Sequence, residues 1–180
     1  STFLSLTRNK SNGIPTAIYF HENQLSYPWS PSDRDKLKNR DMHYGFINYS
    51  SALLADKVFF NSKFHMKSFL DALNPFLKQF PDYKEFDTID IIKEKSEVLF
   101  PGMDLTRFRK HMLIKDSKPN ILWNHRWEYD KNPQSFFSVL KRVIKESNDF
   151  GLIILGENFS KSPKVFEESK KEFVNQIVHW

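Results

Sequence analysis

Short apolar stretches alternate with longer helical stretches along this chain, and this alternation limits its fold more than any other feature. The apolar stretches have the length of buried strands. Strands separated by helices pair in parallel, and parallel sheets are covered by helices. Because the alternation occurs on both sides of residue 104, we expect an α/β fold with two parallel-sheet units, residues 1–104 and 105–180. The predicted strands are 14–20, 57–60, 97–100, 120–124, 150–155 and one that starts at 176.

The stretches between these strands predict helices at 40–55, 63–73, 86–95, 133–145 and 163–173, and a short charged helix that starts at Ser32 or Asp33. Asn61 and Ser62 are expected to cap the second of these helices, and Pro75 to break its pattern. Each half has fewer strands than the five to six typical of an open sheet. Both units are therefore expected to be incomplete, with both ends of the chain cut. One face of the helix at 40–55 is predicted from residues at the 3, 4 and 3 spacing of an amphipathic helix, namely Tyr44, Ile47, Ser51 and Leu54.

The composition fits a folded protein without disulfides. The chain has 180 residues, of which 39% are hydrophobic and 16% aromatic, so it can bury a core. It has no cysteine, which excludes disulfides, thiolate zinc sites and a thiol nucleophile and favours a cytoplasmic location. No apolar run reaches 18 residues, and the polar N-terminus does not resemble a signal peptide. We expect a soluble protein with no membrane partner.

The net charge of +5 favours anionic partners without establishing one. The basic residues are dispersed along the chain, so a solvated surface explains them as well as a nucleic-acid interface does.

Polar side chains crowd the end of the first predicted strand, where His21, Glu22, Asn23 and Gln24 follow one another. Ligands of open α/β sheets bind beyond the carboxyl ends of the strands. His21 could therefore act as a base, a hydrogen-bond donor to sugar hydroxyls or a metal ligand, or it could be a structural histidine. Zinc is disfavoured because neither HExxH nor a second histidine at helical spacing accompanies it. We place Asn61, at the end of the next strand, with Glu22, Asn23 and Gln24 as residues that border a ligand cleft.

Two cations precede the predicted helix at 133–145. Arg126 and Lys131 lie in the loop before Pro133, and a helix N-terminus already favours phosphate groups. The pair suits a diphosphate leaving group, although a charged surface loop explains it equally well. Gly156 and Glu157 follow the strand LIIL, where a nucleotide can approach the backbone.

Two further features are less specific. Gly102 and Asp104 belong to a predicted tight turn, PGMD, in which glycine would permit a positive φ or a close approach of a ligand. Trp123 and Trp127 are predicted to be packing residues, with a place beside a sugar or base as the alternative.

Five stretches resemble the tRNA-queuosine α-mannosyltransferase family of retaining GT-B glycosyltransferases. They occur in this order and cover nearly the whole chain: YFHENQLSYP, KVFFNSKFHMKSFL, PGMDLTRF, HRWEYDKNP and LIILGENF. The resemblance implies two Rossmann-like domains that face each other across a cleft. Residues 1–104 would belong to the acceptor-side domain, and residues 105–180 to the domain that holds a GDP-mannose donor.

The resemblance also implies roles for single residues. Arg126 and Lys131 match the pair that neutralises the donor diphosphate, and His21 matches the histidine that faces the donor sugar. Gly156 and Glu157 would lie beside the nucleotide, and Gly102 and Asp104 near the interdomain hinge. Retaining transfer in this group needs no metal, no cofactor and no protein nucleophile. The rate enhancement would then come mainly from positioning the substrates and from stabilising the charge of the departing phosphate. The acceptor would be queuosine in tRNA.

Other functions stay open at this point. A glycine-bearing loop expected before Ser1 and an acidic motif expected after Trp180 are absent from the chain, which is therefore expected to be inactive by itself. One alternative is another nucleotide-sugar enzyme, such as an epimerase or a transferase acting on a glycan or lipid. The other is a non-catalytic module that binds RNA or nucleotides. The oligomeric state is not indicated.

Overall fold

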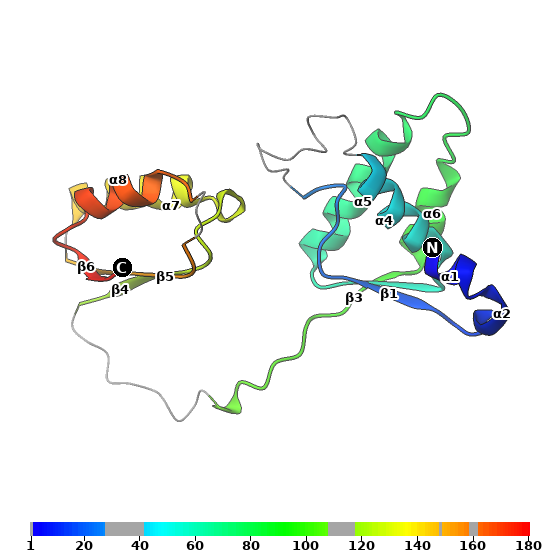
Figure 1. Cartoon of the computed structure of the whole chain (residues 1–180), viewed down its shortest axis with the longest axis horizontal. Coiled ribbons are helices and arrows are strands. Elements are labelled where there is room, and N and C mark those ends of the chain that lie inside the picture. Colours follow the sequence, from blue (N-terminus) through cyan, green and yellow to red (C-terminus); the bar gives the residue numbers. More distant parts are fainter. Residues whose placement is uncertain (1, 28–41, 108–117, 148, 159–161) are drawn as a thin grey trace. The chain divides into compact units, whose positions relative to one another are not determined.

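A computed structural model describes residues 2–27, 42–107, 118–147, 149–158 and 162–180 of the chain. It contains two compact units, Ser1–Asp104 (unit 1) and Leu105–Trp180 (unit 2), each with its own sheet and its own core (Figure 1). The helix predicted to start at Ser32 or Asp33 lies outside the described residues.

Unit 1 contains a three-stranded parallel sheet with the order β1-β2-β3. The helices α4, α5 and α6 gather on one side of this sheet (Figure 1). Strands in chain order with helices between them are the arrangement expected from the alternating pattern. The elements are α1 (Thr2–Leu6), α2 (Arg8–Ser11), β1 (Ala17–Phe20), α4 (Met42–Leu54), β2 (Lys57–Phe60), α5 (Lys63–Leu77), α6 (Asp87–Glu94) and β3 (Ser96–Val98).

Phenylalanine side chains form the centre of the core of unit 1. Phe20 and Phe60 occupy matching register positions on β1 and β2, and their rings stack with centroids 5.4 Å apart. Phe69 of α5 contacts both rings, at 5.2 and 5.3 Å, and is fully buried. Aromatic pairs at these separations add to the stability gained from burial. The cluster therefore fixes α5 against the two strand ends that it faces.

The predicted face of α4 is not the buried one. Tyr44, Ile47 and Leu54 are exposed, whereas Gly45, Tyr49 and Ala52 are buried. A side chain at Gly45 would begin 2.9 Å from Leu25 and 3.2 Å from Phe76, so the absence of one lets α4 approach α5 closely. The prediction failed because α4 carries apolar residues on every side, and such a pattern does not select a face.

Pro75 does not break α5, contrary to the prediction. The helix continues to Leu77, because its last turn buries Phe76 and Leu77 in the core. The carbonyl of Pro75 accepts a hydrogen bond from Gln79 Nε2 at 3.2 Å. Pro75 has no N–H to donate to the carbonyl of Asp71, one turn earlier, and the burial of two large side chains offsets that loss. At the other end, the predicted cap is confirmed, since Ser62 Oγ accepts from the His65 amide at 3.1 Å.

Unit 2 repeats the same topology with different residues. Its sheet is parallel and has the order β4-β5-β6, and α7 and α8 lie together on one face of it (Figure 1). The two incomplete sheets confirm the predicted α/β class with Rossmann-like units. The elements are β4 (Asn120–Asn124), the 3₁₀ turn η2 (Tyr129–Lys131), α7 (Pro133–Glu146), β5 (Gly151–Leu155), α8 (Val165–Glu172) and β6 (Ile177–His179).

Tryptophan takes part in the core of unit 2, as predicted for Trp123 and Trp127. Both side chains are buried. Trp127 stacks on Phe166 of α8 with ring centroids 4.5 Å apart and ring planes 6° from parallel. Phe137 of α7 packs edge-on against the same Phe166 at 5.4 Å. The two helices and the loop after β4 therefore share one aromatic cluster.

The predicted turn at Gly102 is absent. The chain from Leu99 to Leu105 forms neither a turn nor a strand. Gly102 has an ordinary φ, and no atom lies within 4 Å of the position that a side chain would take. The positive φ that would favour glycine is therefore not found at this position.

Candidate functional site

An open hollow of about 340 Å³ lies at the carboxyl ends of β1 and β2, where α5 begins. Four of the five site residues predicted at the ends of the first two strands line it. His21, Glu22 and Asn23 come from the end of β1, and Asn61 comes from the end of β2. Parallel strands bring these side chains together because their carboxyl ends meet at one edge of the sheet.

Asn61 connects the two strand ends. Its Nδ2 donates a hydrogen bond to the His21 carbonyl oxygen at 2.8 Å. Its Oδ1 lies 3.0 Å from Nδ1 of His65 in the first turn of α5. With Nδ2 directed at a carbonyl, Oδ1 can only accept, so the His65 Nδ1 carries the proton of that hydrogen bond. Asn61 therefore holds the His21 backbone and the His65 ring in one arrangement.

Asn23 has a structural role in the wall of the hollow. Its side chain is buried, and Oδ1 accepts hydrogen bonds from the amides of Leu25 and Ser26, both at 3.0 Å. The hydroxyl of Ser26 donates to the same oxygen at 3.2 Å. Such side-chain contacts to the following amides stabilise a turn. The side-chain oxygen of Asn23 thus accepts three hydrogen bonds from within the chain.

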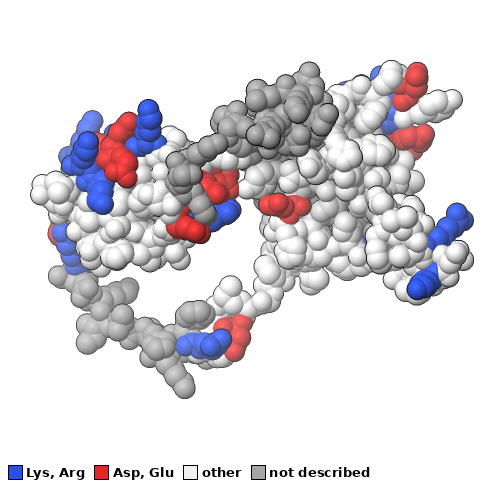
Figure 2. All heavy atoms as spheres, viewed as in Figure 1, with Lys and Arg blue, Asp and Glu red and all other residues white. Residues whose placement is uncertain are grey.

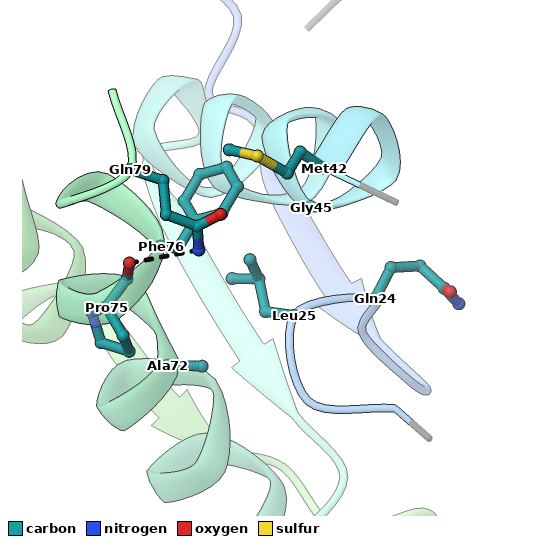
Figure 3. A pocket seen from close by; sticks show the side chains of 8 residues that line it. All are labelled: Gln24, Leu25, Met42, Gly45, Ala72, Pro75, Phe76 and Gln79. Carbon is teal, nitrogen blue, oxygen red and sulfur yellow. Dashed lines mark hydrogen bonds between the residues drawn. The ribbon is translucent and has the colours of Figure 1, made fainter. Parts of the chain in front are cut away.

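Gln24 lines a different hollow from the other predicted residues. This second hollow, of about 280 Å³, lies between α4 and α5 and is lined mainly by apolar side chains such as Leu25 and Phe76 (Figure 3). Figure 3 shows the Gln24 side chain pointing away from Phe76. Its backbone amide donates to Asn48 Oδ1 at 2.7 Å, which ties the turn to α4. The structure therefore separates Gln24 from His21, Glu22 and Asn61.

His65 lines the first hollow and was not among the predicted site residues. It is 8% exposed, and its ring packs edge-on against Phe60 with centroids 5.2 Å apart. Burial lowers the pKa of the His65 imidazole, and the negative charge of Glu22 opposes this shift. The ring is therefore favoured in its neutral form. Its only indication in the sequence is the i, i+4 spacing from Asn61, which places the two side chains on one side of the helix start.

The exposed His21 ring completes the polar edge of this hollow. It packs edge-on against Tyr19 with ring centroids 4.8 Å apart. Tyr19 is in turn held by a hydrogen bond from its hydroxyl to the Leu99 carbonyl, at 3.0 Å. The end of β1 is thus supported on the side of β3 as well as on the side of α5.

In unit 2, the two predicted cations are each paired with a carboxylate. Arg126 Nη2 lies 3.1 Å from Glu128 Oε2, and Lys131 Nζ lies 2.7 Å from Asp130 Oδ2. The Arg126 side chain is 55% exposed, so its ion pair is weak and easily exchanged. The Lys131 side chain is 31% exposed, and its partner carboxylate is nearly buried.

The start of α7 follows directly after these cations. Asn132 caps the helix from a left-handed conformation with a φ of 52°, and its Oδ1 accepts from the Ser135 amide at 3.3 Å. Pro133 occupies the first turn, as predicted for a helix that begins at Asn132 and Pro133. Lys131 therefore lies two residues and Arg126 seven residues before Pro133, where the positive end of a 14-residue helix begins.

Gly156 is required by contacts within the chain. Its φ is +127°, and a side chain there would begin 2.0 Å from the carbonyl oxygen of His125. The Trp127 amide donates to the Glu157 carbonyl at 3.1 Å. The chain after β5 thus lies directly against the loop that carries Arg126, and only glycine fits at the contact.

Three further observations concern the described parts of the chain. No helix there is long and apolar enough to cross a membrane. Within the same residues, no group of three or more histidine and carboxylate side chains gathers where a metal ion could bind. On the face shown in Figure 2, lysine and arginine side chains lie among aspartate and glutamate side chains, and most of the surface is neutral.

Comparison with known proteins relates both units to one family. A family model described as the N-terminal part of tRNA-queuosine alpha-mannosyltransferase matches residues 1–103. The tRNA-queuosine alpha-mannosyltransferase of Drosophila melanogaster is 36% identical over 172 residues, which cover 91% of this chain. The chain belongs to this family. It spans 44% of the length of the fly relative, and the family model ends one residue before the end of unit 1.

Proposed function

We propose that the full-length protein transfers mannose to queuosine in tRNA, with unit 1 on the acceptor side and unit 2 binding the nucleotide-sugar donor. The observation that carries this proposal is the 36% identity to the fly tRNA-queuosine alpha-mannosyltransferase over 91% of the chain. A match of that extent includes both the hollow of unit 1 and the Arg126 loop of unit 2. The 180-residue chain alone would be inactive, because the relative that it matches is more than twice as long.

The proposed donor is GDP-mannose, with its diphosphate held by Arg126 and Lys131. A guanidinium and an ammonium in the loop that leads to a helix N-terminus suit two phosphate groups. Arg126 would leave the carboxylate of Glu128 for the diphosphate, which exposed ion pairs allow at little loss. Gly156 and Glu157 would lie beside the nucleotide, because their backbone borders the Arg126 loop.

The proposed reaction is a retaining transfer of the GT-B type. The acceptor hydroxyl would attack C1 of mannose on the face from which GDP departs, and its proton would pass to the leaving phosphate oxygen. His21 would face the donor sugar and position it, and no protein nucleophile or metal would be required. Stabilisation of charge on the departing diphosphate would then supply most of the rate. Gly102 and Asp104 would lie near the hinge, and the enzyme would act in the cytoplasm.

Calorimetric titration of the full-length protein with GDP-mannose, GDP and UDP-sugars tests the donor. We expect GDP-mannose and GDP to bind and UDP-sugars to bind much more weakly. Arg126→Ala should weaken GDP-mannose binding by roughly 1.5–3 kcal/mol, the range of a hydrogen bond to a charged group. Lys118→Ala is the matched control, because Lys118 is a half-exposed cation of unit 2 with a loose contact of 3.9 Å to Asp149.

A transfer assay tests the reaction itself. The full-length protein should move mannose from GDP-mannose to tRNA that contains queuosine, and should leave the same tRNA without queuosine unchanged. Equal GDP-mannose affinity in Arg126→Ala and the wild type would contradict the proposal that Arg126 binds the diphosphate. Absence of transfer together with retained RNA binding would favour a non-catalytic binding module.

A further inference from the structure

The hollow of unit 1 offers hydrogen-bond acceptors to a ligand. Among the described residues that line it, none is a lysine or an arginine. The side-chain oxygens of Asn23 and Asn61 are already engaged within the chain. Glu22, which is exposed, brings a carboxylate. Among the described lining residues, a ligand that enters the hollow therefore meets a carboxylate, imidazoles and hydroxyl groups, and no lysine or arginine that would bind a phosphate.

His65 supplies the acceptor that is most specific. Its Nδ1 donates to Asn61, so Nε2 of the neutral ring presents a lone pair. Nε2 is buried and has no hydrogen-bond partner among the described residues. The great majority of buried polar atoms in proteins have a hydrogen-bond partner. A buried nitrogen without one, in a residue that lines a hollow, therefore calls for an explanation. A ligand group that donates a hydrogen bond to Nε2 provides it.

We propose that the hollow between β1, β2 and α5 binds a hydroxyl-bearing part of the acceptor nucleoside, and that His65 Nε2 accepts a hydrogen bond from one of its hydroxyls. This assignment rests on the proposed function and names the part of the acceptor that unit 1 binds. Glu22 accepts from a second hydroxyl at the rim of the hollow. His65 is then a specificity-determining residue that contacts the substrate.

The chemistry of the hollow disfavours two other ligand classes. A phosphate would be attracted by the positive end of α5 but would meet the carboxylate of Glu22, and no lysine or arginine among the described lining residues offsets that repulsion. A compact cation would lie against the positive end of the 15-residue helix α5, which disfavours positive charge. A hydroxyl is neutral, and it satisfies a buried nitrogen lone pair without either penalty.

The substitution His65→Asn separates the two nitrogens of the ring. Its amide nitrogen takes the position of Nδ1 and can still donate to Asn61, whereas nothing replaces Nε2. His65→Gln does the reverse and places an amide near the position of Nε2. His43→Asn is the matched control, because His43 is an exposed histidine of the same unit, on α4.

The experiment measures kcat/KM and equilibrium binding of the full-length protein for tRNA with queuosine and for the same tRNA without it. In His65→Asn we expect the preference for the queuosine form to fall about tenfold, the loss of one hydrogen bond to a ligand, with the KM for GDP-mannose unchanged. His65→Gln should recover part of the preference, and His43→Asn should retain all of it.

The outcomes distinguish this inference from the proposed function. If the wild type transfers no mannose to queuosine tRNA, the proposed function fails and this inference fails with it. If the wild type is active and His65→Asn keeps its full preference, only the role of His65 fails. An equal loss for both tRNAs would also overturn it, because a merely structural residue gives that result. Should His65→Asn fail to fold, the recovery or loss of preference in His65→Gln decides the question.

Discussion

Units 1 and 2 share one topology but build opposite chemistry at their strand ends. Each has three parallel strands in chain order. In unit 1 the residues after the strands are mostly neutral and hydrogen-bonded to one another, as Asn61 is to His21 and His65. In unit 2 the loop after β4 carries four charged residues, in which Arg126 and Lys131 are each held by a neighbouring carboxylate.

The difference shows that two units with the same fold can bind different ligands. The sheet determines where the loops begin, and the loops determine which ligand can bind. Neutral groups with fixed hydrogen bonds suit a neutral ligand with many hydroxyls. An exposed ion pair in the loop before a helix, such as that of Arg126 with Glu128, suits an anion, because the anion can replace the carboxylate.

Gly156→Ala should have the largest effect, because it disturbs the contact between the chain after β5 and the charged loop of unit 2. The new side chain would meet the His125 carbonyl 2.0 Å away at a φ of +127°, which only glycine adopts readily. We expect a loss of about 3 kcal/mol or more in the stability of unit 2. Native-state hydrogen exchange of the β4 and β5 amides measures it. Gly102→Ala, in open space at an ordinary φ, should leave stability unchanged within about 0.5 kcal/mol.

Asn61→Leu tests the neutral network of unit 1. The substitution keeps the size of the side chain and removes the hydrogen bonds to the His21 carbonyl and to His65 Nδ1. Two polar groups then lose their partners, and we expect unit 1 to be destabilised by about 2 kcal/mol. Asn74→Leu on the exposed side of α5 is the control. Equal melting curves for the two variants would show that the Asn61 bridge contributes nothing to stability.

Glu128→Gln tests whether the ion pairs of unit 2 are exchangeable. The change frees Arg126 from its carboxylate at 3.1 Å. Because the pair is exposed, we expect GDP-mannose affinity to rise by less than about 1 kcal/mol. Calorimetry on the full-length protein measures it. A fall in affinity would mean that Glu128 orients the guanidinium for the donor.

The pH dependence of unit 1 should give the smallest effect, because the charge of Glu22 opposes the influence of burial on His65. The pKa of His65 is lowered in the folded protein, so the unfolded chain binds its proton more readily. The stability contributed by the neutral ring is complete above about pH 6.5, the ordinary pKa of histidine, and is lost as the pH falls below it. Urea unfolding followed at unit 1 should show this loss in the wild type and not in His65→Asn.

The strands were predictable from the sequence because each is an apolar run bounded by turn residues. KVFF and LIIL predict β2 and β5, and the structure has them at Lys57–Phe60 and Gly151–Leu155. The buried face of α4 was not predictable, because the contact depends on Gly45 and Ala52. Small residues allow close packing of helices and contribute little to a hydrophobic pattern.

The candidate site was predictable only in part. The cluster that begins at His21 stands out because four polar residues follow a strand. His65 does not stand out, because the sequence around a single histidine at a helix start does not show whether its side chain is buried or exposed. Its burial follows from the packing of α5 on Phe60, which is a tertiary contact. Likewise, the close contact of Gly156 with His125 joins two loops that lie 31 positions apart in the sequence, so it is also a tertiary contact.

The Asn61 bridge makes the first turn of α5 a reporter for whatever occupies the neighbouring space. A displacement of the His21 backbone pulls on one end of the amide, and the other end holds the His65 ring. A substrate that stiffens the end of β1 would therefore slow amide exchange at the beginning of the adjacent helix, even at residues that it does not touch. Occupancy could then be followed in solution without a labelled substrate.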